Sequence, residues 1–363
     1  MKNKILYFGM SGNLGGIESH IKNYYQAFTK RNIDIDFIKM EDSICFEEDF
    51  INGGSKVTRL PNRRSNPIRF IVSLYTFLKK HPEYKIIHVH LNTCSSIEPI
   101  LISKLLKRVV FIHSHSEWKG TNMVTRIIHY INRPVAYWLS DEKLACSVAA
   151  GKWLFGNKNF RTMKNAIDLK EYRYNIESRK KMREELGIKG KYVIGHIGRF
   201  SHVKNHEFLI KVFCKVNKKY QNSSLILVGD GELRQKCERL INEMNLNESV
   251  IFTGVRNDIP SLLSSMDVFV FPSHYEGLGM VVIEAQASGL PCIASKYVPR
   301  EVNLTNMVEF LPIDDSEDVW VDKIIKHVNN KRREDTHNLI RENGYDIETA
   351  AGKLEEIYKS YIY

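Results

Sequence analysis

Short apolar runs alternate with longer amphipathic stretches along the chain, and this rhythm occurs in both halves of the sequence. Apolar runs bounded by turn residues predict strands, and apolar positions three and four residues apart predict helices. Because strands and helices alternate, we predict an α/β fold of two doubly wound, Rossmann-like domains, each with a parallel sheet covered on both faces. The predicted strands are 4–9, 34–40, 56–61, 86–91, 109–115, 143–147, 192–199, 224–231, 250–255, 268–273 and 291–295, with the clearest helices at 17–31, 97–108, 206–220, 234–245 and 280–289.

A polar, charge-rich stretch at 163–191 separates the two series and is the predicted linker. The length of 363 residues also suits two domains better than one core. We expect domains at 1–170 and 171–345, with a C-terminal helix at about 346–363 that packs back on the first domain. In doubly wound folds, ligands bind beyond the carboxyl ends of the strands, so we expect the binding residues there, in a cleft between the domains.

The composition argues against a membrane-spanning, secreted or disulfide-rich protein. No apolar stretch is long enough for a transmembrane helix, and the first residues lack the pattern of a signal peptide. Six cysteines are scattered without a CxxC pair, which favours reduced thiols over a disulfide framework or a metal cage. We therefore expect an intracellular, cytoplasmic protein.

The net charge of +11 is concentrated partly in one segment. Residues 56–85 contain eight Lys or Arg and one acid, Glu83, and they include apolar side chains at helical spacing. Such a helix can lie on an anionic membrane surface, or its apolar stripe can face the core while the basic side chains are solvated. No nucleic-acid-binding pattern is present in the sequence, so nucleic acid is not an expected partner.

Two glycine-containing loops follow the first strand of each half. The loop at 9–20 opens a helix, but its glycines miss the spacing of a dinucleotide fingerprint. In the second half, Gly198 and Arg199 end a strand and Lys204 follows five residues later. A planar guanidinium and a point-like ammonium beside a glycine suit a diphosphate. The next strand ends in Gly229-Asp230-Gly231, which by itself is a turn.

The stretch 271–295 holds two glutamates, Glu276 and Glu284. A predicted helix starts near Gly279 to Val281, and its unpaired N–H groups suit a phosphate. Glu276 lies just before that helix start, and Glu284 lies about one turn inside the helix. A nucleoside diphosphate sugar has hydroxyls on both sides of its diphosphate, and each carboxylate could accept hydrogen bonds from one set. We therefore interpret the pair as two hydroxyl-binding groups and not as an acid/base couple.

These motifs resemble those of glycosyltransferase family 4, whose members are retaining enzymes of the two-domain GT-B fold. The stretch 271–295 is similar to the E-x7-E donor motif of that family, Arg199 and Lys204 to its Arg and Lys pair, and 163–168 to its interdomain segment, with Ala166 in place of the usual glycine. The resemblance covers nearly the whole chain and is greatest to bacterial exopolysaccharide and capsule members.

The resemblance implies an acceptor-binding first domain and a second domain that binds the nucleotide sugar. Arg199 and Lys204 would hold the diphosphate, Glu276 the transferred sugar and Glu284 the ribose. The expected donor-binding residues are Gly15, Gly16, Gly198, Arg199, Lys204, Gly229, Gly231, Val255, Glu276, Gly277, Leu278, Gly279, Met280, Val281 and Glu284, of which Glu276, Arg199 and Lys204 are also expected to act in catalysis.

The family also places a histidine beside the reacting sugar. His113 and His115 alternate to one face of a predicted strand, and we favour His113 for this catalytic role. His115 and His90 are candidates for the acceptor or sugar side. His88 shares the pattern of His90. A buried structural histidine is the alternative for each of these positions.

The resemblance implies transfer from a nucleoside diphosphate sugar, with UDP expected as the nucleotide, to a saccharide or polyprenyl-linked saccharide at the inner face of the plasma membrane. No cofactor or metal ion is expected to be required. The alternatives are a sugar-nucleotide epimerase of the same architecture, a nucleotide-sugar-binding protein without turnover, and a dinucleotide-dependent oxidoreductase that would use the loop at 9–16.

Overall fold

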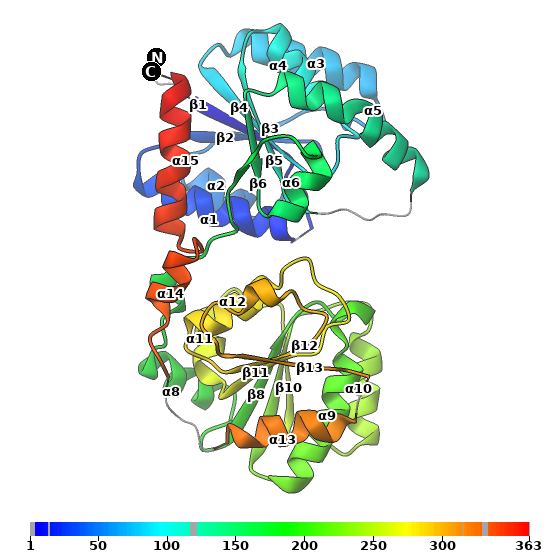
Figure 1. The fold of residues 1–363 in the computed structure, drawn as a ribbon, viewed down its shortest axis with the longest axis vertical. Coiled ribbons are helices and arrows are strands. Elements are labelled where there is room, and N and C mark those ends of the chain that lie inside the picture. Colours follow the sequence, from blue (N-terminus) through cyan, green and yellow to red (C-terminus); the bar gives the residue numbers. More distant parts are fainter. Residues whose placement is uncertain (1–3, 14, 117–121, 315, 329–332, 363) are drawn as a thin grey trace. The chain divides into compact units, whose positions relative to one another are not determined.

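The computed structural model of the chain describes residues 4–13, 15–116, 122–314, 316–328 and 333–362, so Tyr363 of the predicted C-terminal helix lies outside the described residues. The chain divides into two compact units. One contains residues 1–166 and 344–363, and the other contains residues 167–343 (Figure 1). The predicted α/β class is confirmed, because each unit is built on a parallel sheet with helices on both faces.

The first unit contains a seven-stranded sheet with the order β3-β2-β1-β4-β5-β6-β7. All neighbouring strands in this sheet are parallel. Both faces of the central strands are buried, which explains why they read as continuous apolar runs in the sequence. The strands are β1 (Lys4–Phe8), β2 (Ile35–Lys39), β3 (Val57–Arg59), β4 (Tyr84–Leu91), β5 (Val109–Ser114), β6 (Glu142–Ala145) and β7 (Arg161–Thr162).

Two hydrophobic clusters cover the two faces of this sheet. Helices α1 (Gly16–Lys30), α2 (Glu47–Asn52) and α15 (Ile347–Ile362) pack on one face, where α15 lies against α1 (Figure 1). Helices α3 (Pro67–Lys80), α4 (Glu98–Leu105), α5 (Met123–Leu139) and α6 (Val148–Phe155) pack on the other. The C-terminal helix thus belongs to the first unit, although the chain reaches it only after completing the second.

The second unit contains a six-stranded parallel sheet with the order β10-β9-β8-β11-β12-β13. Helices α9, α10 and α13 supply much of the core on one of its faces. The strands are β8 (Tyr192–Ile197), β9 (Ser223–Val228), β10 (Val250–Gly254), β11 (Val268–Phe271), β12 (Cys292–Ser295) and β13 (Val308–Leu311). The helices are α7 (Leu169–Tyr172), α8 (Ile176–Glu185), α9 (His206–Lys219), α10 (Arg234–Glu243), α11 (Ile259–Ser265), α12 (Met280–Ala287), α13 (Glu317–Lys326) and α14 (His337–Glu342), with 3-10 turns at His202–Lys204 and Arg300–Val302.

The basic segment 56–85 contains β3, the amphipathic helix α3 and the start of β4. Phe70, Leu74 and Leu78 of α3 are buried in the core, whereas Arg69 and Lys79 are exposed. The apolar stripe that the sequence suggested for a membrane surface therefore faces the protein core over most of its length. Ile71 is an exception, since its side chain is exposed. Among the described residues, no helix has the length and apolar character needed to cross a membrane.

Candidate functional site

The expected binding residues of the second unit follow four neighbouring strands of its sheet. Gly198 and Arg199 follow β8, Gly229 and Gly231 follow β9, Val255 follows β10, and residues 276–284 follow β11. These strands are adjacent in the order β10-β9-β8-β11. Because the carboxyl ends of parallel strands meet at one edge of a sheet, the fold brings these segments to the same edge.

Hydrogen bonds connect the loop after β11 to the 3-10 turn that contains Lys204. The backbone N–H of His274 donates to the carbonyl of Val203 at 2.8 Å. The Asn205 side chain donates from Nδ2 to the carbonyl of Pro272 at 3.2 Å. These contacts hold the segment around Lys204 and the loop before α12 in a fixed relation.

Lys204 and Glu276, which the sequence assigned to different parts of a ligand, form an ion pair with each other. The Lys204 Nζ lies 2.6 Å from the Glu276 Oε1, and the two side chains are 21% and 11% exposed. The same Nζ lies 4.6 Å from the centre of the Phe271 ring, in a cation–π contact. A phosphate bound at Lys204 would therefore share this cation with Glu276. Sequence reasoning did not predict this pair.

Arg199 lies on the surface of the same edge. Its side chain is 75% exposed, and its guanidinium lies 3.2 Å from a carboxylate oxygen of Glu232. Exposed ion pairs of this kind contribute little to stability, so Arg199 can exchange Glu232 for another anion at small cost. Lys204 is the more deeply placed of the two cations.

Gly229 and Gly231 allow the loop after β9 to approach the loop after β8. A Cβ on Gly229 would lie 2.3 Å from the carbonyl oxygen of Gly198, and one on Gly231 would lie 2.5 Å from that of Phe200. Both glycines also have positive φ angles, which L side chains rarely adopt. The two glycines are thus required by packing within the protein, independently of any ligand.

Helix α12 begins at Met280, as the sequence predicted. Gly279 is its N-cap, with a φ of 90°, and no side chain among the described residues caps the helix there. The first-turn N–H groups of a helix have no partner within the helix, and they attract anions together with the helix dipole. Gly277 is exposed and Leu278, Met280 and Val281 are partly exposed beside this helix start. An anion could reach the helix terminus through this segment.

Glu284 lies one turn inside α12 and is partly buried. Burial raises the pKa of its carboxyl group to about 7, and a hydrogen bond with the Tyr172 side chain acts in the opposite direction. The carboxyl group is therefore poised between its neutral and charged forms near neutral pH. Tyr172, at the end of α7, was not predicted as part of the site. Its position in the linker gave no indication that it would face α12.

In the first unit, five histidines gather at the carboxyl ends of β4 and β5. His88 and His90 lie in β4, and His113 lies in β5. His115 directly follows the last residue of β5. His20 of α1 joins them, with its ring 4.7 Å from that of His113 and 4.8 Å from that of His115. His90 Nδ1 lies 2.8 Å from His115 Nε2. The structure thus brings together all the predicted histidines and adds His20, which has no distinguishing sequence pattern.

Burial keeps these imidazoles neutral. It lowers the pKa of His20 to about 3 and lowers the pKa values of His90, His113 and His115 well below the usual value. Nitrogen atoms of these four residues lie within 4.8 Å of one another, so imidazole ligands for one transition metal ion are available. However, His90 and His115 bond to each other and the rings of His113 and His115 stack at 4.3 Å, which differs from a tetrahedral zinc arrangement.

The glycine loop before α1 is organised by a buried carboxylate. Glu18 Oε1 accepts hydrogen bonds from the Ser11 backbone N–H at 3.1 Å and from the Ser11 hydroxyl at 2.8 Å. Gly15 is the N-cap of α1, and Gly15 and Gly16 are both exposed. Their backbone N–H groups are thus accessible at a helix start, whereas Glu18 is occupied within the loop.

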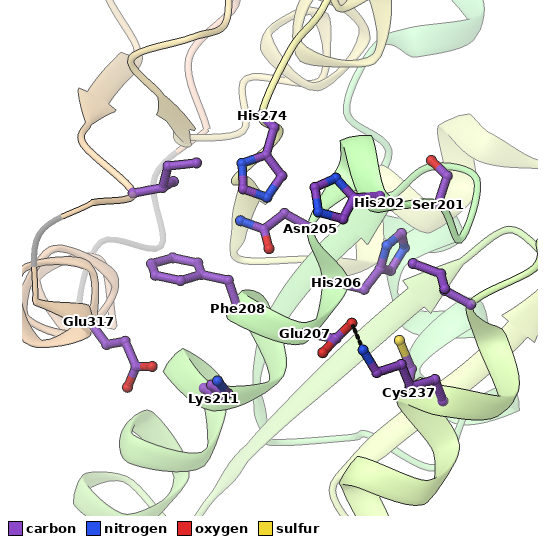
Figure 2. Close-up of a pocket in the computed structure, with 13 residues that line it drawn as sticks. Ser201, His202, Asn205, His206, Glu207, Phe208, Lys211, Cys237, His274 and Glu317 are labelled. Atoms are coloured by element: carbon purple, nitrogen blue, oxygen red, sulfur yellow. Dashed lines mark ion pairs between the residues drawn. The ribbon is translucent and has the colours of Figure 1, made fainter.

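A cavity of about 390 Å³ lies beside the 3-10 turn that contains Lys204. Figure 2 shows that side chains of the 3-10 turn and α9 surround it, and that the ion pair of Glu207 and Lys236 borders it. His202 and His274 line this cavity, but Lys204, Glu276 and Glu284 do not. None of the predicted donor residues lines the cavity, although their neighbours Ser201, His202 and Asn205 do.

Comparisons with known proteins agree with this arrangement of residues. Residues 14–171 match the family model described as Glycosyltransferase Family 4, and residues 178–346 match that of Glycosyl transferases group 1. The chain belongs to glycosyltransferase family 4. Between them, the two models cover both units, so the family assignment applies to the chain as a whole.

Individual relatives of this glycosyltransferase match it over nearly its full length. The putative glycosyltransferase EpsF of Bacillus subtilis is 29% identical, over 98% of this chain and 96% of the relative. The UDP-Gal:alpha-D-GlcNAc-diphosphoundecaprenol alpha-1,3-galactosyltransferase of Escherichia coli is 25% identical, over 98% and 97%. The crystal structure of Anabaena Alr3699/HepE in complex with UDP is 21% identical and superposes with a TM-score of 0.77 over 98% of this chain and all of that one. The GT-B fold is thereby confirmed.

Proposed function

We propose that this glycosyltransferase moves a sugar from a nucleoside diphosphate sugar to a saccharide or lipid-linked saccharide, with retention of the anomeric configuration, in the synthesis of bacterial surface polysaccharides. One observation carries the proposal. A partly buried cation, Lys204, a helix start at Gly279 without a side-chain cap among the described residues, and two carboxylates, Glu276 and Glu284, lie at one edge of one sheet. A nucleoside diphosphate sugar has a matching arrangement of anionic centre and flanking hydroxyls.

In this proposal the second unit binds the donor. Lys204, Arg199 and the first turn of α12 bind the diphosphate, Glu284 accepts hydrogen bonds from the ribose, and Glu276 from the transferred sugar. Negative charge builds on the departing diphosphate as its bond to the sugar breaks. The two cations and the helix dipole stabilise that charge more in the transition state than in the bound donor. Since these groups supply the positive charge, we propose transfer without a metal ion.

The first unit is proposed to bind the acceptor and to face the reacting sugar. His113 is buried and neutral, so it can hydrogen-bond to a sugar hydroxyl without bringing a positive charge to the reacting carbon. His90 and His115 are proposed to pack beside the His113 ring and to contact the acceptor or the transferred sugar. Gly15 and Gly16 offer backbone N–H groups at the start of α1 for the phosphate side.

The choice of substrates is supported by relatives. The names of HepE structures include complexes with UDP and with UDP-glucose, so we propose a UDP-sugar as donor. The Escherichia coli relative is named for an acceptor that carries diphosphoundecaprenol. This name supports a polyprenyl-linked saccharide as acceptor, and with it a site of action at the inner face of the plasma membrane.

The test is an assay of the purified chain against a panel of UDP- and GDP-sugars, with free nucleotide as the readout in the absence of acceptor. We expect slow hydrolysis of one UDP-sugar. Glu276→Ala should abolish it with a melting temperature nearly unchanged, whereas the matched control Glu248→Ala, an exposed acid of the same unit, should retain it. Retained activity in Glu276→Ala would refute the assignment. An isomerised donor would indicate an epimerase, and binding without turnover would indicate a sensor.

A further inference from the structure

The first unit exposes an unusual concentration of large hydrophobic side chains. Of the 23 that are exposed among the described residues, 13 lie on three helices, α3, α4 and α5. Scattered single hydrophobic side chains on a surface are ordinary, but a contiguous group is typical of an interaction site. The members are Ile68, Ile71, Val72, Leu101, Leu105, Met123, Val124, Ile127, Ile128, Tyr130, Ile131, Val135 and Trp138, and we call this group the apolar face.

Helix α5 contributes most of the apolar face because its hydrophobic stripe points outward. Of its 17 residues, only His129 and Ala136 are buried. Ile127, Ile131 and Trp138 are 55%, 66% and 76% exposed, and their spacings of four and seven residues place them on one side of the helix. An amphipathic helix on a globular protein normally turns such a stripe to the core. The orientation of α5 therefore requires another apolar environment to cover the stripe.

The remaining members lie on helices adjacent to α5. Helix α4 packs against both α3 and α5, and all three cover the same face of the sheet (Figure 1). Leu105 of α4 is 71% exposed and Ile68 at the start of α3 is 75% exposed. The members of the apolar face thus come from three neighbouring helices that cover the same side of the sheet.

The charge on these helices is almost entirely positive. They carry six basic residues, Arg69, Lys79, Lys80, Lys104, Arg126 and Arg133, and one acid, Glu98. Glu98 is paired with Arg63 at 2.7 Å. Aromatic side chains accompany the cations, since Lys158 lies 4.9 Å over the Trp138 ring and Arg133 lies 5.3 Å over the Tyr130 ring. Cations beside Trp and Tyr at the edge of an apolar surface are typical of membrane interfaces.

We propose that the apolar face docks this glycosyltransferase on an anionic lipid surface, with the outer stripe of α5 in the boundary between headgroups and acyl chains. The positive charge is complementary to anionic lipid. A second copy of the chain is a poorer partner, because two such basic faces would repel each other.

The proposed membrane-binding surface includes α4 and α5 in addition to the segment 56–85 that the sequence suggested. It rests on the proposed function only in its purpose, which is to bring the enzyme to a lipid-linked acceptor. Attachment is interfacial, because no helix among the described residues could cross the bilayer. Lipid binding and sugar transfer can be measured separately, so failure of one proposal is distinguishable from failure of the other.

The test is co-sedimentation of the full, untagged chain with phosphatidylcholine vesicles, with and without roughly 30% phosphatidylglycerol as the anionic lipid. We expect binding to the anionic vesicles that weakens with salt. The double variant Ile127→Glu/Ile131→Glu should lower the partition coefficient by more than about tenfold, because each change removes an inserted apolar side chain. The matched control Ile176→Glu/Val319→Glu replaces exposed apolar residues of the second unit and should bind like the parent.

Because the substituted side chains are exposed, both double variants should keep the melting temperature and the donor hydrolysis of the parent. Absence of binding to anionic vesicles would overturn the proposal, and so would equal binding by the Ile127/Ile131 variant and its control. A parent chain that ignores vesicles but dimerises, with dimerisation lost in the Ile127/Ile131 variant, would identify the face as an interface between copies instead.

Discussion

Replacement of Glu284 by glutamine should make the protein more stable at alkaline pH and leave it nearly unchanged in acid. Burial raises the pKa of the Glu284 carboxyl from 4.5 to about 7. As pH rises through 4.5 the unfolded chain ionises first, while the folded chain keeps its proton until about pH 7. Stability is therefore lost between these two values, and the loss is complete above pH 7. Glutamine has no such titration and can still accept the Tyr172 hydrogen bond.

The magnitude follows from the size of the shift. A shift of 2.5 units, from 4.5 to about 7, corresponds to about 3.4 kcal/mol at 1.36 kcal/mol per unit. Because Glu284 is partly exposed, solvent screening lowers this figure, and we expect Glu284→Gln to gain about 1 to 3 kcal/mol at pH 8. At pH 4.5 the difference from the parent should fall below about 0.5 kcal/mol, because the carboxyl is then protonated in the folded state and only about half ionised in the unfolded state.

The measurement is urea unfolding of the parent and of Glu284→Gln at pH 4.5 and pH 8, followed by circular dichroism. Glu243→Gln, at an exposed position of α10, is the matched control and should give the same small difference at both pH values. A Glu284→Gln effect that is equal at the two pH values would show that the carboxyl is not buried enough to hold its proton. The explanation of its charge state would then be wrong.

Four further predictions concern the proposed site. If ribose hydroxyls bind the charged form of Glu284, affinity for the UDP-sugar should rise from pH 5 to pH 7.5 in the parent but not in Glu284→Gln, as measured by calorimetry. Lys204→Ala should lower kcat by about 100-fold or more, because it removes the partly buried cation proposed to lie beside the leaving diphosphate, and Lys204→Arg should recover part of that loss. Gly229→Ala should lower the free energy of unfolding by about 2 kcal/mol or more, since the new Cβ would meet the Gly198 carbonyl oxygen, and a denaturant titration would test it. Treatment with EDTA should leave transfer unchanged, and a requirement for added metal would contradict the metal-free mechanism.

The sequence was sufficient to predict features that depend on local pattern. Strands buried on both faces are largely apolar, so the central strands of both sheets were readable as near-continuous apolar runs, interrupted in β4 and β5 by buried histidines. The start of α12 was readable because Gly279 ends the flexible stretch and the apolar run begins at once. The edge strand β13 was missed because Val308–Leu311 is short and its two central residues are only partly buried.

Other features depend on contacts between residues far apart in sequence, and no local pattern predicts them. The ion pair of Lys204 and Glu276 joins segments 72 residues apart, and its formation depends on how two loops are bonded to each other. Tyr172 meets Glu284 only after the linker has folded against α12. His20 looks like any inward position of an amphipathic helix. In α5 the periodicity shows that an apolar stripe exists, but periodicity alone does not show that the stripe faces outward.

The ion pair between Lys204 and Glu276 also determines how the proposed donor would bind. A diphosphate that approaches Lys204 brings negative charge close to Glu276, and these like charges would repel each other unless the cation lies between them. The same geometry places the transferred sugar, whose hydroxyls are hydrogen-bond donors, next to the carboxylate. A free nucleoside diphosphate lacks that sugar and gains only the contact with the cation. We therefore expect Glu276→Gln to bind UDP more tightly than the parent, because the repulsion is removed, while losing sugar transfer. Weaker binding of UDP by Glu276→Gln would show that the glutamate serves mainly to hold Lys204 in place.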